Sequence, residues 1–431
     1  MTTATGGPTR LLPFTGVDNL MRALDEPRRP QTIELEVAVG GRLDDQRLRD
    51  AVGAAADRHP MARARQVRSK PLDLNYAWHI DSTWRRDPVE VCTVAETAEL
   101  DATRDAFYSQ HIDLEVGPPF RVLLVHEGDV GDRVMLSVNH SAFDGVGTLR
   151  LLQSISRSYA GEVDSVPSID AFEARTFLED RPRPTTTSRA AASGSLGDML
   201  TPPARLASSG PAKTPGFGIL HLDLDAADAL GPGEATVNDV LMTALHLSIE
   251  SWNKAQGAAC DRVTVMMPVN QRPASWRSEI LANLVLPGQV TSSRSDRSRP
   301  ADLLVKVASQ TRQIKTRGVD NTPSALPRRV PVLLRQLLPH VIDGVADRTA
   351  DTAVLSNLGR VPDPPWFGNS GRGLWFSPPP RRPVVLTVGA ATVGEKLTIG
   401  LRWCNDSFSA TAARQFAETF TAMLGAVSGE R

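Results

Sequence analysis

His140 and Asp144 stand four positions apart, and Gly145 and Gly147 follow them directly. A neutral imidazole, with an ordinary pKa of about 6.5, accepts a proton at neutral pH and can act as a general base. The carboxylate of Asp144 can orient that imidazole, cap a following helix or pair with a distant arginine. The glycines allow a ligand to approach the backbone closely. This spacing indicates a concave polar site, with His140 either a base or a structural histidine bonded to a loop carbonyl.

A strand, a turn and a helix over residues 134–152 must position this pair. Apolar side chains alternate along residues 134–138 and predict a strand that continues to His140. Because successive side chains of a strand point to opposite faces, Asn139 and His140 should face opposite ways. After the turn, Thr148 is the expected helix cap, and the helix should end near Gly161. Its apolar positions have helical spacing: Leu149, Leu152, Ile155 and Tyr159.

Composition and motifs exclude several other classes of protein. The sequence lacks GxSxG, Walker and HExxH patterns, and Arg150 occupies the third glycine position of a dinucleotide loop. The cysteines Cys92, Cys260 and Cys404 have no metal-ligand spacing, so we expect no metal site and a reduced, cytoplasmic protein. The net charge of −1 does not favour nucleic acid. No signal peptide and no apolar run of about 20 residues is seen, so we expect no membrane insertion.

The 431 residues are expected to form two comparable α/β lobes. Residues 1–180 form the first lobe, with a half-buried strand over residues 33–39 that alternates apolar and polar side chains. Residues 181–216 are rich in Pro, Ser, Thr, Gly and Ala, which indicates a linker or mobile loop. Residues 217–431 form the second lobe, with helices over residues 237–252, 301–316 and 410–427.

Two further stretches of the second lobe are interpreted differently. Residues 326–345 have a helical pattern that Pro331 and Pro339 interrupt. Residues 361–380 are rich in Pro, Gly and Trp and are expected to form a loop. Their aromatic residues can be packing anchors or contacts for an acceptor substrate: Trp366, Phe367, Trp375 and Phe376. Arg381 and Arg382 can meet an acidic carrier protein or a coenzyme phosphate, or can simply be solvated charges.

Five short motifs of the sequence resemble those of a known family. Residues 139–145, NHSAFDG, resemble the HHxxxDG motif of the condensation-domain superfamily, which includes chloramphenicol acetyltransferase. The similarity is greatest to the condensation-like, polyketide-associated acyltransferase and wax ester synthase branches. Four more segments resemble motifs of these branches in the expected order: His59-Pro60, TVNDV at residues 236–240, PVNQR at residues 268–272 and SNLGR at residues 356–360.

The resemblance implies two chloramphenicol-acetyltransferase-like lobes, a pseudo-dimeric α/β sandwich with a tunnel between them. A phosphopantetheine or coenzyme A thioester would enter this tunnel as donor substrate, with no permanently bound cofactor. His140 matches the catalytic histidine, which acts as general base on the acceptor. Asp144 matches a structural aspartate, and Arg272 is the candidate for its ion-pair partner. The Gly145 backbone should lie close to the tunnel.

The sequence departs from the motif at one position, where Asn139 replaces the first histidine. The strand parity indicates that Asn139 supports the loop and does not touch substrate. This replacement makes a typical peptide-synthetase condensation domain a poorer match. Ser356 or Asn357 can donate a hydrogen bond to a thioester oxyanion, or can belong to a strand-end turn.

The sequence therefore predicts a free-standing, monomeric acyltransferase of bacterial natural-product or lipid biosynthesis. It would move an acyl group from an acyl carrier protein or coenzyme A to a small-molecule alcohol or amine. One alternative is an amide-forming or cyclising condensation catalyst acting on a carrier-bound intermediate. The other is a non-catalytic condensation-like module that docks carrier proteins.

Overall fold

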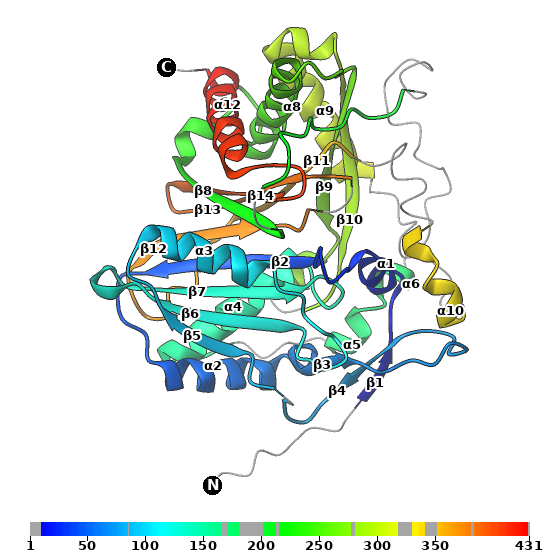
Figure 1. Ribbon diagram of the computed structural model, residues 1–431, viewed down its shortest axis with the longest axis vertical. Coiled ribbons are helices and arrows are strands. Elements are labelled where there is room, and N and C mark those ends of the chain that lie inside the picture. Colours follow the sequence, from blue (N-terminus) through cyan, green and yellow to red (C-terminus); the bar gives the residue numbers. More distant parts are fainter. Residues whose placement is uncertain are drawn as a thin grey trace.

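The computed structural model describes residues 10–84, 86–164, 170–180, 201–212, 215–276, 281–317, 330–340, 351–380 and 383–429. Strands and helices mix along these residues and form two α/β lobes, which lie one above the other in Figure 1. The described ends of the chain lie at opposite ends of the molecule. The predicted fold class, two chloramphenicol-acetyltransferase-like α/β lobes, is confirmed.

The lower lobe in Figure 1 is built on a five-stranded sheet of order β12-β2-β7-β6-β5. Its strands are β2 (Thr32–Val39), β5 (Val89–Thr93), β6 (Phe120–His126), β7 (Asp132–Asn139) and β12 (Gly371–Ser377). Helices α2 (Asp45–Arg58) and α4 (Gly145–Ala160) cover one face, and α3 (Thr97–Tyr108) lies on the face toward the upper lobe.

A small sheet of order β1-β4-β3 stands beside this lobe. It contains β1 (Arg10–Pro13), β3 (Ala64–Gln66) and β4 (Ala77–Ile80), and α1 (Gly16–Leu24) follows β1. Figure 1 shows α1 next to the short helix α10 (Val332–Arg335), with α5 (Ala171–Ala174) and α6 (Phe177–Asp180) nearby.

The upper lobe contains a six-stranded sheet of order β10-β9-β11-β13-β14-β8. Its strands are β8 (Phe217–Asp225), β9 (Arg262–Asn270), β10 (Val285–Ser293), β11 (Ala353–Arg360), β13 (Leu386–Val393) and β14 (Lys396–Cys404). Helices α8 (Val237–Ala255), α9 (Pro300–Arg317) and α12 (Ala410–Ser428) pack on it. Thr236 begins α8 with a capping box to Asp239, which fixes the start of this helix.

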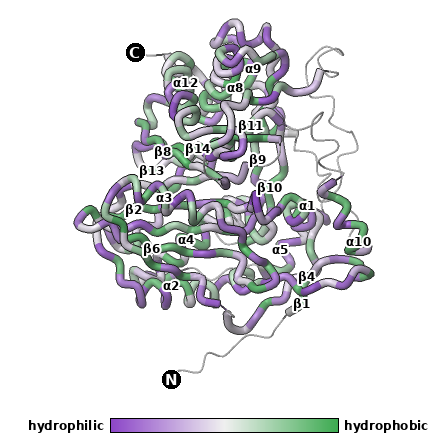
Figure 2. Tube along the Cα trace, viewed as in Figure 1, coloured by the Kyte–Doolittle hydropathy of each residue, from purple (hydrophilic) through white to green (hydrophobic). Residues whose placement is uncertain are grey.

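Each lobe has its own apolar core, which forms where strands and amphipathic helices meet. Leu48, Val52 and Ala55 of α2 pack against Leu151 and Ile155 of α4 and the strands beneath them. Figure 2 shows hydrophobic residues along β6 and α4 and hydrophilic residues on the outer turns of α2. A second core lies between α8, α12 and the six-stranded sheet.

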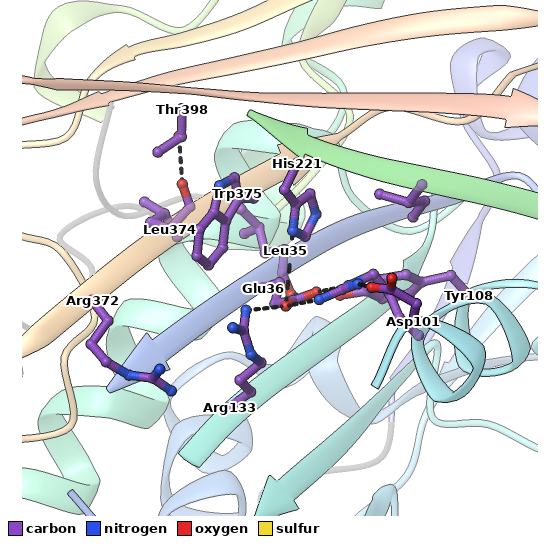
Figure 3. Close-up of polar contacts among 12 residues, drawn as sticks. Leu35, Glu36, Asp101, Tyr108, Arg133, His221, Arg372, Leu374, Trp375 and Thr398 are labelled. Carbon is purple, nitrogen blue, oxygen red and sulfur yellow. Dashed lines mark hydrogen bonds and ion pairs between the residues drawn. The ribbon is translucent and has the colours of Figure 1, made fainter. Parts of the chain in front are cut away.

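The expectation of a half-buried β2 was wrong, because all eight residues of the strand are buried. Its polar face, which carries Glu34 and Glu36, meets the upper lobe instead of water. Glu36 accepts two hydrogen bonds from Arg104, of 2.7 and 2.9 Å, and one of 2.7 Å from Arg133. Figure 3 shows Glu36 between Arg133 and His221, with Trp375 beside His221. An ion-pair layer therefore occupies the polar face of β2.

Two other expectations for the second half need correction. Residues 361–380 are not all loop, since residues 371–377 form β12, which pairs antiparallel with β2 and so adds a strand from the second half of the chain to the lower lobe's sheet. The frequent Gly and Pro residues of this stretch predicted a loop, although most side chains of β12 are buried. In the predicted helix 326–345, residues 330–340 are described. They are helical at α10 (Val332–Arg335), after Pro331, and again at residues 338–340, with a turn at residues 336–337 between them. The remaining residues of that stretch lie outside the described part.

The predicted linker 181–216 is described in part, since residues 181–200 and 213–214 lie outside the described residues. Residues 201–212 run along the upper lobe, where the Ala204 amide donates to the Arg262 carbonyl at 2.7 Å. None of the helices in the described ranges is long and apolar enough to span a bilayer.

Candidate active site

The loop of residues 140–144 connects β7 to α4 and faces the upper lobe. β7 ends at Asn139, and the backbone amide of His140 donates to the Gln31 carbonyl at 2.7 Å. Asp144, and not the predicted Thr148, is the helix cap, and its side chain accepts from the Gly147 amide at 2.9 Å. Thr148 instead lies in the first turn and donates to the Asp144 carbonyl. The helix starts early because Asp144 is also held from the other lobe.

The half-buried imidazole of His140 is oriented by its own loop. Its Nδ1 lies 3.1 Å from the Phe143 carbonyl, which can only accept, so Nδ1 carries the proton in this contact. The lone pair is then on Nε2. Burial lowers the pKa of His140, against the opposing charge of Asp144. The imidazole is therefore neutral at neutral pH, as a general base must be.

Asp144 and Arg272 form a buried ion pair between the lobes, and both side chains are fully buried. The guanidinium donates to both carboxylate oxygens, at 2.7 and 2.9 Å, and the Leu284 amide adds a third bond of 2.7 Å. The contact that the resemblance implied is thus present. Asp144 is engaged by backbone amides and Arg272, while the His140 ring bonds to Phe143. The arrangement is therefore a clamp on the loop and not a His–Asp pair.

Asn139 also holds the loop, from the side away from the cavity. Its Nδ2 donates to Asp25 at 2.8 Å, and its Oδ1 accepts from the Ser141 amide at 2.9 Å. The side chain is fully buried. The geometry agrees with the strand parity, which directed Asn139 and His140 to opposite sides.

A cavity of about 160 Å³ lies between the lobes, with His140 in its wall. Gly145 also lines it, and a Cβ there would meet the Phe376 ring at 3.1 Å, so any larger residue would require this ring to shift. Asn357 lies in the opposite lobe, and its Oδ1 accepts from the Gly359 amide at 2.8 Å. The polar lining residues are Gln31, His140, Asn270, Ser356 and Asn357, and the apolar ones include Met21, Leu24, Ile33, Met266, Val285, Leu358 and Phe376.

Sequence reasoning missed Asn283, which contacts the His140 loop from the upper lobe. Its Nδ2 donates to the carbonyls of His140 and Ser141, at 2.7 and 3.0 Å. The neighbouring Ala282 carbonyl accepts from the Asp144 amide at 3.2 Å. No motif signals Asn283, because contacts to backbone carbonyls require only an amide at the right place in the fold.

The other singled-out residues are divided between cavity and scaffold. Phe376 lines the cavity, while Trp375 stacks on His221 with ring centroids 4.8 Å apart. Trp366 and Phe367 pack with the lower core. His59 follows the end of α2 as its C-cap and bonds to Ser154 at 2.7 Å, away from the cavity wall. Arg381 and Arg382 lie outside the described residues.

Comparison with known proteins finds similarity over nearly the whole length of a relative. An uncharacterised protein of Mycobacterium tuberculosis is 32% identical over 411 residues, which cover 90% of this chain and 92% of the relative. No protein-family model matches the chain.

Solved structures give the same fold at low sequence identity. The epimerization domain of tyrocidine synthetase B has a TM-score of 0.66 and 15% identity, covering 99% of this chain and 98% of that domain. A mutant starter condensation domain of rhizomide synthetase, in complex with C8-CoA and Leu-SNAC, has a TM-score of 0.66 and 14% identity, with 97% and 95% covered.

Proposed function

Because this chain has the fold of condensation domains, we propose that it belongs to their superfamily and is an acyltransferase that uses a thioester donor and His140 as general base. The observation that carries the proposal is the orientation of the imidazole. Nδ1–H is tied to the Phe143 carbonyl, and the ring lines the cavity between the lobes, which makes Nε2 the basic nitrogen. The proposed donor is an acyl carrier protein or coenzyme A, and the acceptor is a small alcohol or amine.

The proposed reaction uses Nε2 of His140 twice. It first takes the proton from the acceptor hydroxyl or amine while that atom attacks the thioester carbonyl carbon. The carbon becomes tetrahedral and its oxygen gains negative charge. When the carbon–sulfur bond breaks, the proton on Nε2 passes to the leaving thiolate, and His140 returns to its neutral form. The lowered pKa of His140 supports this cycle because it keeps the ring neutral before each turnover.

Ser356 and Asn357 are the proposed oxyanion donors. Both line the cavity across from the His140 loop, on a strand of the other lobe. The Asn357 Oδ1 accepts from the Gly359 amide, which fixes the side-chain amide and leaves its N–H₂ end as the donor. A well-placed oxyanion donor is worth about 3 kcal/mol of transition-state stabilisation.

The direct test is acyl transfer by His140→Ala. Medium-chain acyl-coenzyme A and acyl-pantetheine thioesters are incubated with a panel of alcohols and amines, and products are measured by mass spectrometry. Loss of the base should lower kcat by about 10²- to 10⁴-fold. His340→Ala is the matched control, since His340 is exposed and lies outside the cavity wall.

Equal turnover by wild type and His140→Ala would refute the general-base role. Absence of transfer by the wild type, combined with binding of an acyl carrier protein, would favour the non-catalytic docking module instead. Among the active pairs, ester or amide products decide between the alcohol acceptor and the condensation alternative.

The oxyanion assignment has its own test. Asn357→Ala and Ser356→Ala are compared for kcat with the same donor and acceptor. The residue that donates to the oxyanion should cost about 10²-fold or more in kcat when it is removed. If neither variant changes kcat, the oxyanion donor lies elsewhere and residues 356–357 form only a strand-end turn.

A further inference from the structure

Asp25 is a buried carboxylate near the His140 loop, and it accepts hydrogen bonds from three separate segments of the lower lobe. It follows α1 as the C-cap of that helix. Its Oδ1 accepts from the Gln31 amide at 2.9 Å, and its Oδ2 accepts from Nδ2 of Asn139 at 2.8 Å. Oδ2 also accepts from Nε2 of His111 at 3.1 Å. The proposed acyl-transfer steps use neither Asp25 nor His111.

Two of these donors, Gln31 and Asn139, also hold the backbone at His140. The Gln31 carbonyl accepts from the His140 amide at 2.7 Å, and Oδ1 of Asn139 accepts from the Ser141 amide at 2.9 Å. Two successive amides of the loop are therefore each bound to a residue that is itself bound to Asp25. Because a side chain follows its backbone, this arrangement fixes the direction from which the imidazole enters the cavity.

His111 holds Asp25 from the side away from the loop. A carboxylate only accepts hydrogen bonds, so Nε2 of His111 carries the proton in this contact. The hydrogen bond to Asp25 raises the pKa of His111, which favours an imidazolium beside the carboxylate. Hydrogen bonds to an ionised group are roughly twice as strong as neutral ones. A half-buried histidine thus supports a buried anion, and that anion supports the loop.

The side chain of Asn139 matches its two partners exactly in donor and acceptor type. Its Nδ2 only donates and meets the Asp25 carboxylate, while its Oδ1 only accepts and meets the Ser141 amide. Both polar atoms of this fully buried side chain are therefore paired. The residue that replaces the first histidine of the motif is part of a complete hydrogen-bond network, and its presence does not indicate a decayed site.

We propose that Asp25 and Asn139 form a positioning pair for His140, with His111 as the residue that holds Asp25. This inference rests on the proposed role of His140 as general base. Neither member of the pair lines the cavity, so both act through the backbone of the loop and not on substrate. Together they take the place of the first histidine of the motif.

The first test exchanges the two side chains and measures kcat in a double-mutant cycle. Asn139→Asp alone sets a second carboxylate against Asp25 and should lower kcat about 100-fold, while Asp25→Asn alone should lower it about tenfold. The double variant restores one donor and one acceptor with the direction reversed, and its groups still accept from the Gln31 and Ser141 amides. Its kcat should return to within about threefold of the wild type.

The second test removes the support behind Asp25. His111→Ala should lower kcat about tenfold and leave KM for the thioester donor unchanged, because a charge-assisted hydrogen bond outside the cavity is lost. His79→Ala is the matched control, since His79 contacts Asp81 at 2.6 Å, is 28% exposed against 29% for His111, and lies outside the cavity wall. Melting temperatures verify that each variant is folded.

A third measurement needs no substrate. Nitrogen-15 NMR of histidine-labelled protein reports which ring nitrogen of His140 carries the proton, and the His140→Ala spectrum identifies its signals. The wild type should show protonated Nδ1 and unprotonated Nε2. In Asp25→Asn the two signals should shift toward each other as the tautomers mix, and the double variant should restore the wild-type positions.

Unchanged His140 signals in Asp25→Asn, or a double variant no more active than Asp25→Asn, would overturn the proposal. Absence of turnover by the wild type would count against acyl transfer alone, because the NMR comparison still decides whether Asp25 positions the imidazole. The two proposals can therefore fail separately.

Discussion

Two buried ion pairs join the lobes, and they differ in how completely the carboxylate is satisfied. In each, a carboxylate of the lower lobe meets an arginine of the upper lobe: Asp144 with Arg272, and Glu34 with Arg402. The Asp144 oxygens accept from the guanidinium twice and from two backbone amides. Glu34 accepts from Ser137 and Arg402 at 3.2 Å each, and its Oε2 is buried without a partner.

The difference appears in the protonation of Glu34. Burial raises the pKa of Glu34 to about 7, even though Arg402 and the Thr32 and Ser137 hydroxyls favour its charged form. Two buried pairs that each join a carboxylate to an arginine can therefore differ in how well the carboxylate is stabilised. With few donors around it, the buried carboxylate of Glu34 titrates near neutral pH.

The largest effect is expected from Arg272→Met. This substitution leaves Asp144 buried without its cation and should lower the free energy of unfolding by about 3–5 kcal/mol. Urea unfolding measures the change. Arg312→Met is the control, because its ion pair with Glu234 is exposed and should contribute about 1 kcal/mol or less. A loss in Arg272→Met no larger than in the control would mean that the clamp adds nothing to stability.

A smaller, pH-dependent effect is expected from Glu34→Gln. With the pKa of Glu34 raised to about 7, the folded protein keeps a proton that the unfolded chain releases above its ordinary pKa of 4.5. The stability from this group is therefore present below that value and is lost as the pH rises toward 7. Relative to Glu34→Gln, the wild type should lose about 1.4 kcal/mol per pH unit in this window.

Urea unfolding at several pH values between 5 and 7 measures this difference. Glu90→Gln is the control, because Glu90 is 45% exposed and pairs with Arg121 at the surface, so its curve should run parallel to that of the wild type. Parallel curves for wild type and Glu34→Gln would show that Glu34 keeps its charge and that the two buried pairs are alike.

The smallest effect is expected from Asn283→Ala, which removes the two amide contacts to the His140 loop. We expect kcat to fall about tenfold while KM for the donor is unchanged, since about 1–2 kcal/mol of hydrogen bonding is lost. Asn369→Ala loses a similar amide bond, to the Phe367 carbonyl, far from the cavity and should keep its kcat. Equal kcat in both variants would remove Asn283 from the positioning residues.

The strand, turn and helix around His140 could be predicted because their signals are local. Alternation reveals β7, helical spacing reveals α4, and the motif resemblance named Arg272 as partner of Asp144 from 128 positions away. The cap was misplaced because Asp144 and Thr148 are both good caps, and the ion pair to Arg272 decides between them.

The polar face of β2 could not be predicted from its own residues. Alternating Glu34 and Glu36 look the same whether water or a second lobe covers them, and Arg402 is 368 positions from Glu34. The role of Asn283 could not be predicted for a related reason. Its partners are backbone carbonyls of the His140 loop, which are present whatever the sequence of that loop. The burial of the polar face of β2 and the contacts of Asn283 both depend on position in the fold and not on residue type.

The strand β12 has a consequence for any attempt to divide this chain. It covers the outer edge of β2 with backbone hydrogen bonds from Gly371 to Ser377. A fragment that ends at residue 180 would lack this cover and expose a sheet edge whose amides and carbonyls invite pairing with other chains. Such a fragment should aggregate, and adding a peptide of residues 371–377 should restore its solubility.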